Sequence, residues 1–164
     1  MRVLLLRHAD AGDPDPRHWP DDHERPLTDA GRVQHRRLAE TLARMGIRFD
    51  HLLTSPLLRA RQTAEITAAA YGWSRGIEVT DALGDRAGPA DVLAVLPRFG
   101  QEAAVLCVGH EPNLSTLAAL LISDAGRARI RLQKSGLIAI DCDGYPEPGR
   151  SSLRFHLDPA LLLA

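Results

Sequence analysis

Cysteine is scarce in this sequence, and neither sign of charge is in marked excess. Only two cysteines occur, Cys107 and Cys142, and their separation does not fit a zinc site. Each lies inside an apolar run, so we interpret both as buried free thiols. The 20 basic and 21 acidic residues leave a formal net charge of −1. This balance argues against nucleic acid or an anionic membrane as a partner.

Long apolar runs are absent as well. The apolar stretch after Met1-Arg2 is interrupted by Arg7-His8, which makes it too short for a signal peptide. No run approaches the ~20 apolar residues that a membrane span needs. We therefore expect a cytoplasmic protein, and a monomer. The 164 residues, 45% of them hydrophobic, predict a single domain over 1–164 with a core that requires no disulfide or metal.

Strand and helix patterns alternate along the chain. The sequence predicts strands at 2–6, 51–54, 77–79, 103–108, 137–141 and 152–157. It predicts helices at 28–45, 57–71 and 89–99, and one that opens at Pro112. Such alternation indicates a three-layer α/β/α sandwich with a mainly parallel sheet. The inner stripe of the first helix is predicted to be Ala30, Val33, Leu38, Leu42 and Met45.

The segment 10–26 has four prolines and no periodicity, so it is predicted to be a loop. It contains His18, His23 and five aspartates, a composition that would fit either a metal site or a solvated lid. The prolines and the lack of helical spacing favour the lid. Trp19 within it would either contact a partner protein or pack the loop onto the body, and we expect the second.

Three short strings end strands of the predicted sheet: 6–8, 54–59 and 108–110. Ligand sites in open α/β sheets gather outside the carboxyl ends of parallel strands, so these strings should meet in space. Each string brings a cation or an imidazole, and none brings a carboxylate. The sequence therefore predicts an anion site.

Four ordered motifs carry a family resemblance: Arg7-His8-Ala9, Arg25-Pro26-Leu27-Thr28-Asp29-Ala30-Gly31, Ser55-Pro56-Leu57-Leu58-Arg59-Ala60-Arg61-Gln62-Thr63-Ala64 and Gly109-His110-Glu111-Pro112. The pattern resembles the histidine phosphatase superfamily, and within it the SixA-type phosphohistidine phosphatases. The resemblance covers most of the chain to about residue 115. It implies a phosphoglycerate mutase-like fold and metal-independent phosphatase chemistry without a cofactor.

The resemblance also implies roles for individual residues. His8 would be the nucleophile, and Arg7 and Arg59 would hold the phosphate oxygens, with His110 as a further donor and Ser135 as another phosphate contact. The site would accept a phosphate- or sulfate-type anion. Imidazole attacks phosphorus only when one ring nitrogen holds a lone pair, so we expect the other nitrogen of His8 to donate to a backbone carbonyl.

Two departures from the family pattern bear on the chemistry. Ala9 stands where the family has glycine, and we expect an allowed backbone conformation there. Only 50 residues lie between Arg59 and His110, which leaves little room for the insertion that carries a general acid in mutase-like relatives. Asp85 is the first candidate for such an acid, with Asp81 and Glu78 behind it.

A missing acid favours a particular substrate. An alkoxide leaving group, with a conjugate acid of pKa ~16, needs protonation, whereas imidazole, with a pKa of about 6.5, departs with less help. We therefore expect a phosphohistidine-bearing phosphotransfer or phosphorelay protein as the substrate, and no essential acid for it. The alternatives are a small-molecule phosphomonoesterase with the same core, a non-catalytic phosphate-binding module, and a metal hydrolase that uses the acidic loop. His35, His51 and His156 lie outside these motifs and are interpreted as ordinary surface or partly buried residues.

Overall fold

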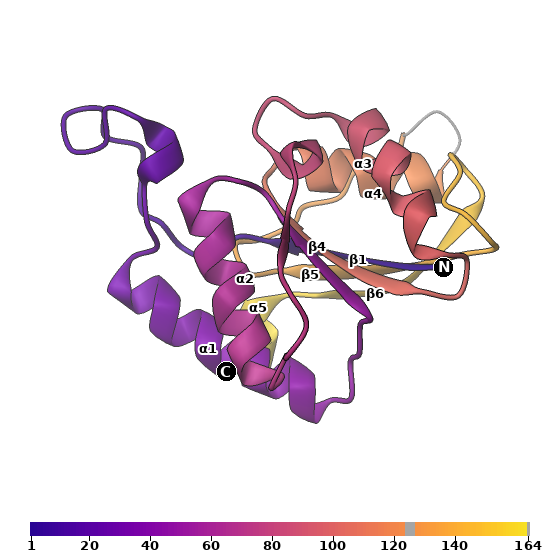
Figure 1. Ribbon diagram of the computed structural model, residues 1–164, viewed down its shortest axis with the longest axis horizontal. Coiled ribbons are helices and arrows are strands. Elements are labelled where there is room, and N and C mark those ends of the chain that lie inside the picture. The colour runs from indigo at the N-terminus through magenta and orange to yellow at the C-terminus, as the bar shows by residue number, and fades with distance from the viewer. Residues whose placement is uncertain (124–126, 164) are drawn as a thin grey trace.

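The computed structural model describes residues 1–123 and 127–163, which form a six-stranded sheet with helices on both faces (Figure 1). The strands are β1 (Arg2–Arg7), β2 (His51–Thr54), β3 (Glu78–Val79), β4 (Ala104–Gly109), β5 (Leu137–Cys142) and β6 (Ser151–Leu157). The α-helices are α1 (Asp29–Arg44), α2 (Leu58–Ala70), α3 (Pro89–Val95), α4 (Asn113–Ile122) and α5 (Pro159–Leu162). Three short 3-10 helices are η1 (Asp22–Glu24), η2 (Asp81–Leu83) and η3 (Leu96–Phe99).

The strand order is β3-β2-β4-β1-β5-β6. The four strands from β3 to β1 run parallel, whereas β5 and β6 join antiparallel. The predicted α/β fold is confirmed, with a mixed sheet whose parallel part carries the motifs. The pair β5–β6 is antiparallel because a short connection joins the two strands, whereas neighbouring parallel strands need a longer crossover.

The apolar run of β1 is continuous because both faces of the sheet are covered. Val3 and Leu5 face the core that contains α3 and α4, whereas Leu4 and Leu6 face the core that contains α1 and α2. The strand β4 alternates in the same way. Parallel sheets between two helical layers bury both faces of their central strands, which gives this sequence pattern. The three layers are therefore set by the central strands.

The first helix begins as predicted and buries a different stripe. Thr28 caps α1 by accepting a hydrogen bond from the Gly31 amide, and Gly46 follows the helix with a φ of 76°. The buried side of the helix consists of Gly31, His35, Leu38, Ala39 and Leu42. The predicted inner positions Ala30, Val33 and Met45 are exposed. The prediction was wrong there because it followed apolar residues only, while the true face includes a glycine and a histidine.

The segment before α1 leaves the body as a projecting loop that carries η1 (Figure 1). Its start is packed closely against α1, because a Cβ at Gly31 would collide with the Asp10 carbonyl oxygen. The predicted helix at 89–99 is divided into α3 and η3, consistent with Pro97, which lacks the amide that a continuing α-helix needs. Among the described residues, no helix is long and apolar enough to cross a membrane.

Candidate active site

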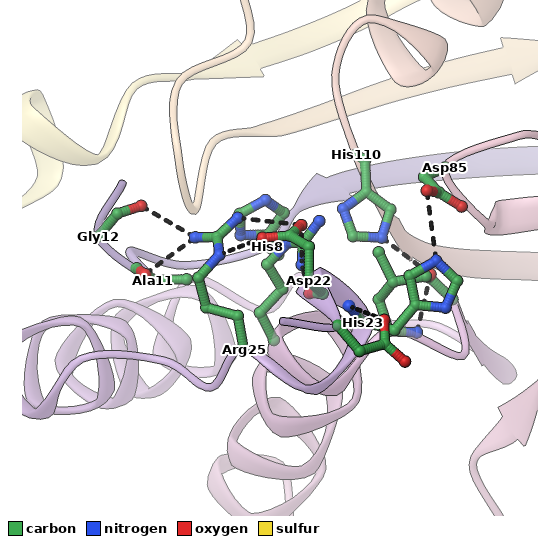
Figure 2. Close-up of polar contacts among 12 residues, drawn as sticks. His8, Ala11, Gly12, Asp22, His23, Arg25, Asp85 and His110 are labelled. Atoms are coloured by element: carbon green, nitrogen blue, oxygen red, sulfur yellow. Dashed lines mark hydrogen bonds and ion pairs between the residues drawn. The ribbon is translucent and has the colours of Figure 1, made fainter. Parts of the chain in front are cut away.

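The structure brings the strand-end motifs together at one edge of the sheet. His8 follows β1, His110 follows β4, and Arg59 lies in the first turn of α2 after β2. The ring centroids of His8 and His110 are 5.0 Å apart, and Figure 2 shows the two imidazoles beside each other. Only 8%, 7% and 6% of His8, Arg59 and His110 is exposed. Parallel strands that end at the same edge explain why residues so far apart in sequence meet here.

One nitrogen of the His8 ring is fixed by a backbone contact. Nδ1 lies 2.7 Å from the carbonyl oxygen of Ala9, which can only accept a hydrogen bond. Nδ1 therefore carries the hydrogen, and Nε2 keeps a lone pair. Ala9 itself has no positive φ, since Ser135 is the sole non-glycine residue with one in the described chain. Ala9 thus occupies the glycine position of the family without backbone strain.

The orientation of His110 is set by Ser55, which is fully buried. The Ser55 hydroxyl accepts the Leu57 amide at 3.2 Å and lies 2.8 Å from His110 Nε2. Its own hydrogen is then available to His110 Nε2, which leaves the imidazole hydrogen on Nδ1. A donor at Nδ1 is what an anion beside the two rings requires.

Two arginines complete the cluster, which we call the cradle (Arg7, His8, Arg59 and His110). Arg7 donates through Nη1 to the Leu132 carbonyl at 2.9 Å, and Arg59 donates through Nη1 to the Asp22 carbonyl at 2.8 Å. In the described part of the chain, four buried side-chain nitrogens or oxygens lack a hydrogen-bond partner. Three of them belong to the cradle: Arg7 Nε, Arg59 Nε and His110 Nδ1. An oxyanion would satisfy all three donors.

Burial and neighbouring cations keep both imidazoles neutral. Burial, with His110 and the two arginines nearby, lowers the pKa of His8 to about 3. Burial, then Arg59, lowers the pKa of His110 to about 3. Burial also lowers the pKa of Arg59, and Asp22 acts against this shift. Near neutral pH, the His8 imidazole is therefore neutral, in a site whose formal positive charge comes from arginine.

Beneath the cradle lies a buried group of hydroxyls and an imidazole, which we call the floor network (His35, Thr63, Thr67 and Ser135). Thr63 Oγ1 accepts the Ala9 amide at 3.0 Å and donates to the Arg59 carbonyl at 2.7 Å. Thr67 Oγ1 donates to the Thr63 carbonyl at 2.9 Å. Thr63 thus holds the backbone beside His8 to the helix that carries Arg59.

His35 joins the two ends of this floor network. Its Nε2 lies 2.9 Å from Thr67 Oγ1, and its Nδ1 lies 3.0 Å from Ser135 Oγ. Ser135 has a φ of 62°, and its amide lies within hydrogen-bonding distance of the carbonyls of Arg7 and His8, at 3.1 and 3.2 Å. The interpretation of His35 as an ordinary surface or partly buried residue was wrong, since it is fully buried. Burial lowers its pKa to about 4.

Ser135 was predicted to contact phosphate. The structure places it next to His8 through its backbone, and its hydroxyl lies within hydrogen-bonding distance of His35. The predicted phosphate contact stays a prediction. The floor network was missed in the sequence although Arg59, Thr63 and Thr67 recur at every fourth position, which places them on one helical face.

The loop 10–26 reaches the cradle through Asp22. The Asp22 carboxylate lies 3.1 Å from Arg59 Nη1 and 2.7 Å from Arg25 Nε. Arg25 is buried and also donates to the carbonyls of Ala11 and Gly12, each at 2.9 Å (Figure 2). The hydrogen bond from Arg25 lowers the pKa of Asp22. The motifs that predicted a cluster of cations therefore missed a carboxylate at its edge.

The three candidate acids lie in different places. Asp85 lies near the loop, where its carboxylate is 3.4 Å from His23 Nε2 (Figure 2). Glu78 forms an ion pair with Arg98, and Asp81 belongs to η2. Among the described residues, no three His, Cys, Asp or Glu side chains gather in a way that could hold a metal ion.

Comparisons with known proteins show the family to which this fold belongs. The sequence model of the histidine phosphatase superfamily (branch 1) matches residues 3–89. The phosphohistidine phosphatase SixA of Escherichia coli is 30% identical over 155 residues, which cover 82% of this chain and 94% of that protein. A structure of the protein histidine phosphatase SixA complexed with tungstate superimposes with a TM-score of 0.84 and 28% identity, covering 99% of both chains.

A more distant structure shares the fold alone. The α-ribazole phosphatase of Shigella flexneri superimposes with a TM-score of 0.67 and 21% identity, covering 97% of each chain. The resemblance read from the four motifs is therefore confirmed at the level of the family. With the model match and the E. coli relative taken together, this chain belongs to the histidine phosphatase superfamily.

Proposed function

We propose that this protein removes phosphate from phosphohistidine on another protein, through a phosphohistidine intermediate at its own His8. The observation that carries the proposal is the hydrogen bond from His8 Nδ1 to the Ala9 carbonyl, which leaves the Nε2 lone pair in the cradle. Arg7, Arg59 and His110 each contribute a buried nitrogen without a hydrogen-bond partner to the same cluster. The similarity to SixA proteins supports the choice of substrate.

The reaction has two displacements at phosphorus. In the first, the His8 Nε2 lone pair forms a bond to phosphorus while the bond from phosphorus to the substrate nitrogen breaks. The electrons of that bond stay on the substrate ring, whose other nitrogen carries a proton, so neutral imidazole leaves. The His8 ring, which keeps its hydrogen on Nδ1, is positively charged while it holds the phosphoryl group. In the second, water attacks the same phosphorus, the bond to His8 Nε2 breaks, and inorganic phosphate leaves. The water protons pass to phosphate and to solvent, and His8 returns neutral.

The cradle acts on charge in both displacements. During phosphoryl transfer, negative charge spreads over the three non-bridging oxygens. The guanidinium groups of Arg7 and Arg59 are held in place by backbone carbonyls, and each has a buried Nε without a partner, as has His110 at Nδ1, so these donors stabilise that charge without rearranging. The positive charge of the cradle comes from the arginines because both imidazoles are neutral.

The carboxylate at the edge of the cradle favours a leaving group that needs no acid. Asp22 is held by Arg25, which lowers its pKa, so it is ionised near neutral pH and has no proton to give. Imidazole leaves with little protonation, whereas an alkoxide does not. The site therefore suits phosphohistidine better than an alkyl phosphate.

A small-molecule phosphomonoesterase is the second candidate, favoured by one observation. Asp85 lies at the rim beside His23, where a carboxyl group could protonate the oxygen of a leaving alcohol. If it does so, alkyl phosphates such as glycerol phosphate become substrates and Asp85 becomes necessary for them.

The test compares three substrates in EDTA: a histidine phosphotransfer domain phosphorylated with phosphoramidate, p-nitrophenyl phosphate and glycerol phosphate. We expect fast release from the phosphoprotein, weak release from the aryl ester and little from the alkyl ester. His8→Ala should abolish all activity, and the matched control His156→Ala, an exposed histidine on β6, should change none. Brief labelling with phosphoprotein should give acid-labile, base-stable phosphate on the wild type and on His156→Ala, and none on His8→Ala.

The outcomes separate the candidates. A preference for glycerol phosphate would favour the phosphomonoesterase, and tungstate binding without any phosphate release would favour a non-catalytic phosphate-binding module. Activity that survives in His8→Ala, or that EDTA removes, would contradict the proposed mechanism itself.

A further inference from the structure

The projecting loop holds an exposed surface that the phosphatase chemistry does not use. Residues 13–21 are exposed with the exception of Asp15, which is half-buried. In Figure 1 this segment extends away from the sheet and its helices. We call residues 13–21 the arm. Its base adjoins the cradle, because the next residue, Asp22, forms an ion pair with Arg59. His23 follows and lies within hydrogen-bonding distance of Asp85.

The arm has a defined conformation of its own. The Asp15 carboxylate accepts the Arg17 amide at 3.0 Å and lies 2.7 Å from His18 Nδ1. The Asp15 carbonyl accepts the amides of His18 and Trp19, at 3.0 and 2.8 Å. Prolines at 14, 16 and 20 restrict the backbone further. A surface that is already ordered loses less entropy on binding, which favours recognition.

Trp19 is the main apolar feature of the arm. It is 37% exposed, and its neighbours on the arm are exposed or half-buried. That Trp19 packs the loop onto the body stays a prediction, and the exposed part of its ring is available to a partner. An exposed tryptophan on an ordered loop is typical of binding anchors, because its large surface becomes buried at little entropic cost.

Charge on the arm indicates what kind of surface it would meet. Three aspartates and one arginine give residues 13–21 a negative balance, next to a cradle made positive by Arg7 and Arg59. A phosphorylated histidine flanked by basic residues would complement both regions at once. A small phosphate ester would fill the cradle and leave the arm without a role.

We propose that the arm is a docking surface for the phosphohistidine-bearing protein, with Trp19 as its apolar anchor and its aspartates facing basic residues of that protein. The proposal rests on the proposed function, since it names the surface by which that same site selects a protein. The arm binds substrate equally before and during phosphoryl transfer. Its loss should therefore raise KM and leave kcat unchanged.

The experiment measures Trp19→Ala on the phosphorylated phosphotransfer domain, on a short phosphohistidine peptide and on p-nitrophenyl phosphate. We expect kcat/KM for the domain to fall about tenfold or more, and the values for the peptide and the ester to stay the same. The matched control is Tyr145→Ala, because Tyr145 is 40% exposed in the turn between β5 and β6. This control should leave all three substrates unaffected.

A charge reversal tests the second part of the proposal. Asp13→Lys on the arm should lower kcat/KM for the phosphorylated domain several-fold and should make kcat/KM less sensitive to salt. The control Glu102→Lys, at an exposed turn after η3, should change neither quantity. Equal losses on all three substrates in Trp19→Ala would show that the loop serves the chemistry and would overturn the docking role.

The two proposals fail in different ways. If the wild type hydrolyses the phosphorylated domain and both arm variants match it, the docking role is wrong and the proposed function stands. If the wild type hydrolyses the ester but neither phosphohistidine substrate, the proposed function is wrong and the docking role falls with it.

Discussion

The floor network and the arm both adjoin the cradle and are built by opposite means. His35, Thr67 and Ser135 are buried and joined by hydrogen bonds between residues as far as 100 positions apart. The arm is exposed and organised by contacts within a few residues of Asp15. Buried hydrogen-bond networks fix one geometry at a high cost of disruption, whereas exposed loops tolerate change.

The difference indicates a division of tasks. The proposed phosphoryl transfer requires His8 and its donors to be held within fractions of an ångström, and the floor network contacts the Ala9 amide and the Arg7 and His8 carbonyls. The proposed choice of a protein substrate requires an accessible surface, which is the role that we assign to the arm. Changes to the floor network should affect stability and every substrate alike, and changes to the arm should affect one substrate class.

Arg59 connects the two regions, so its removal should have the largest effect. Arg59→Ala should lower kcat/KM about 10³-fold on every substrate, since it removes a buried donor for the transferring phosphoryl group. Arg59→Lys should recover part of the loss, because lysine keeps the charge without the planar pair of donors. Steady-state rates with the phosphoprotein and p-nitrophenyl phosphate measure both.

Arg61→Ala is the matched control, as Arg61 is exposed on the same helix and should behave as wild type. A loss in Arg59→Ala that is restricted to the protein substrate would assign Arg59 to recognition and break the comparison.

His35→Ala should produce the next largest effect, on the free energy of unfolding. The substitution leaves the buried Ser135 hydroxyl without its partner and opens a cavity, which together cost about 3 kcal/mol. Urea unfolding at pH 7 measures the loss, with His156→Ala as the exposed control. In a double-mutant cycle with Ser135→Ala, the two residues should couple by about 1 kcal/mol. A cost below about 0.5 kcal/mol would mean that the floor network does not stabilise the fold.

The pH dependence of stability gives a smaller and more specific prediction. The pKa of His35 is about 4 in the folded protein and about 6.5 when unfolded. Between these values the unfolded state binds more protons, so stability falls as pH is lowered from 7 to 5. His35 accounts for roughly 2 kcal/mol of that fall.

The variant His35→Gln isolates this contribution. The pKa values of His8 and His110 are also lowered in the folded protein, so the free energy of unfolding of the wild type should fall steeply from pH 7 to pH 5. Unfolding of the variant should bind about one proton fewer per molecule than unfolding of the wild type. Urea unfolding at pH 7, 6 and 5 gives the slopes. Equal slopes in the two proteins would contradict a neutral buried His35.

The cradle could be predicted from the sequence because each of its residues lies in a short motif that can be recognised without knowing the rest of the chain. Each motif pairs a strand end with a cation or imidazole, and the topology of a parallel sheet then places His8, Arg59 and His110 at one edge. The backbone partner of His8 could also be foreseen, since the chemistry requires a lone pair on one nitrogen.

The floor network could not be foreseen in the same way. His35 lies 32 residues from Thr67 and 100 from Ser135, and no local rule links them. A signal did exist, since His35 lies three residues before Leu38 and seven before Leu42, on the buried face of α1. Had polar residues at helical spacing been counted as candidates for burial, His35 would have been predicted on the inner face of α1 in place of Val33 and Met45.

Asp85→Asn should have the smallest effect, and it tests whether a residue outside the cradle takes part in the chemistry. Asp85 touches the loop through His23 and is about as exposed as that histidine, so its loss removes a solvent-screened pair of little energetic weight. We expect less than about a threefold change in kcat/KM for phosphohistidine, because departing imidazole needs no dedicated acid. A collapse of phosphohistidine activity would make Asp85 an essential acid. It would also mean that the exposed loop region takes part in the chemistry, which the contrast between the floor network and the arm excludes.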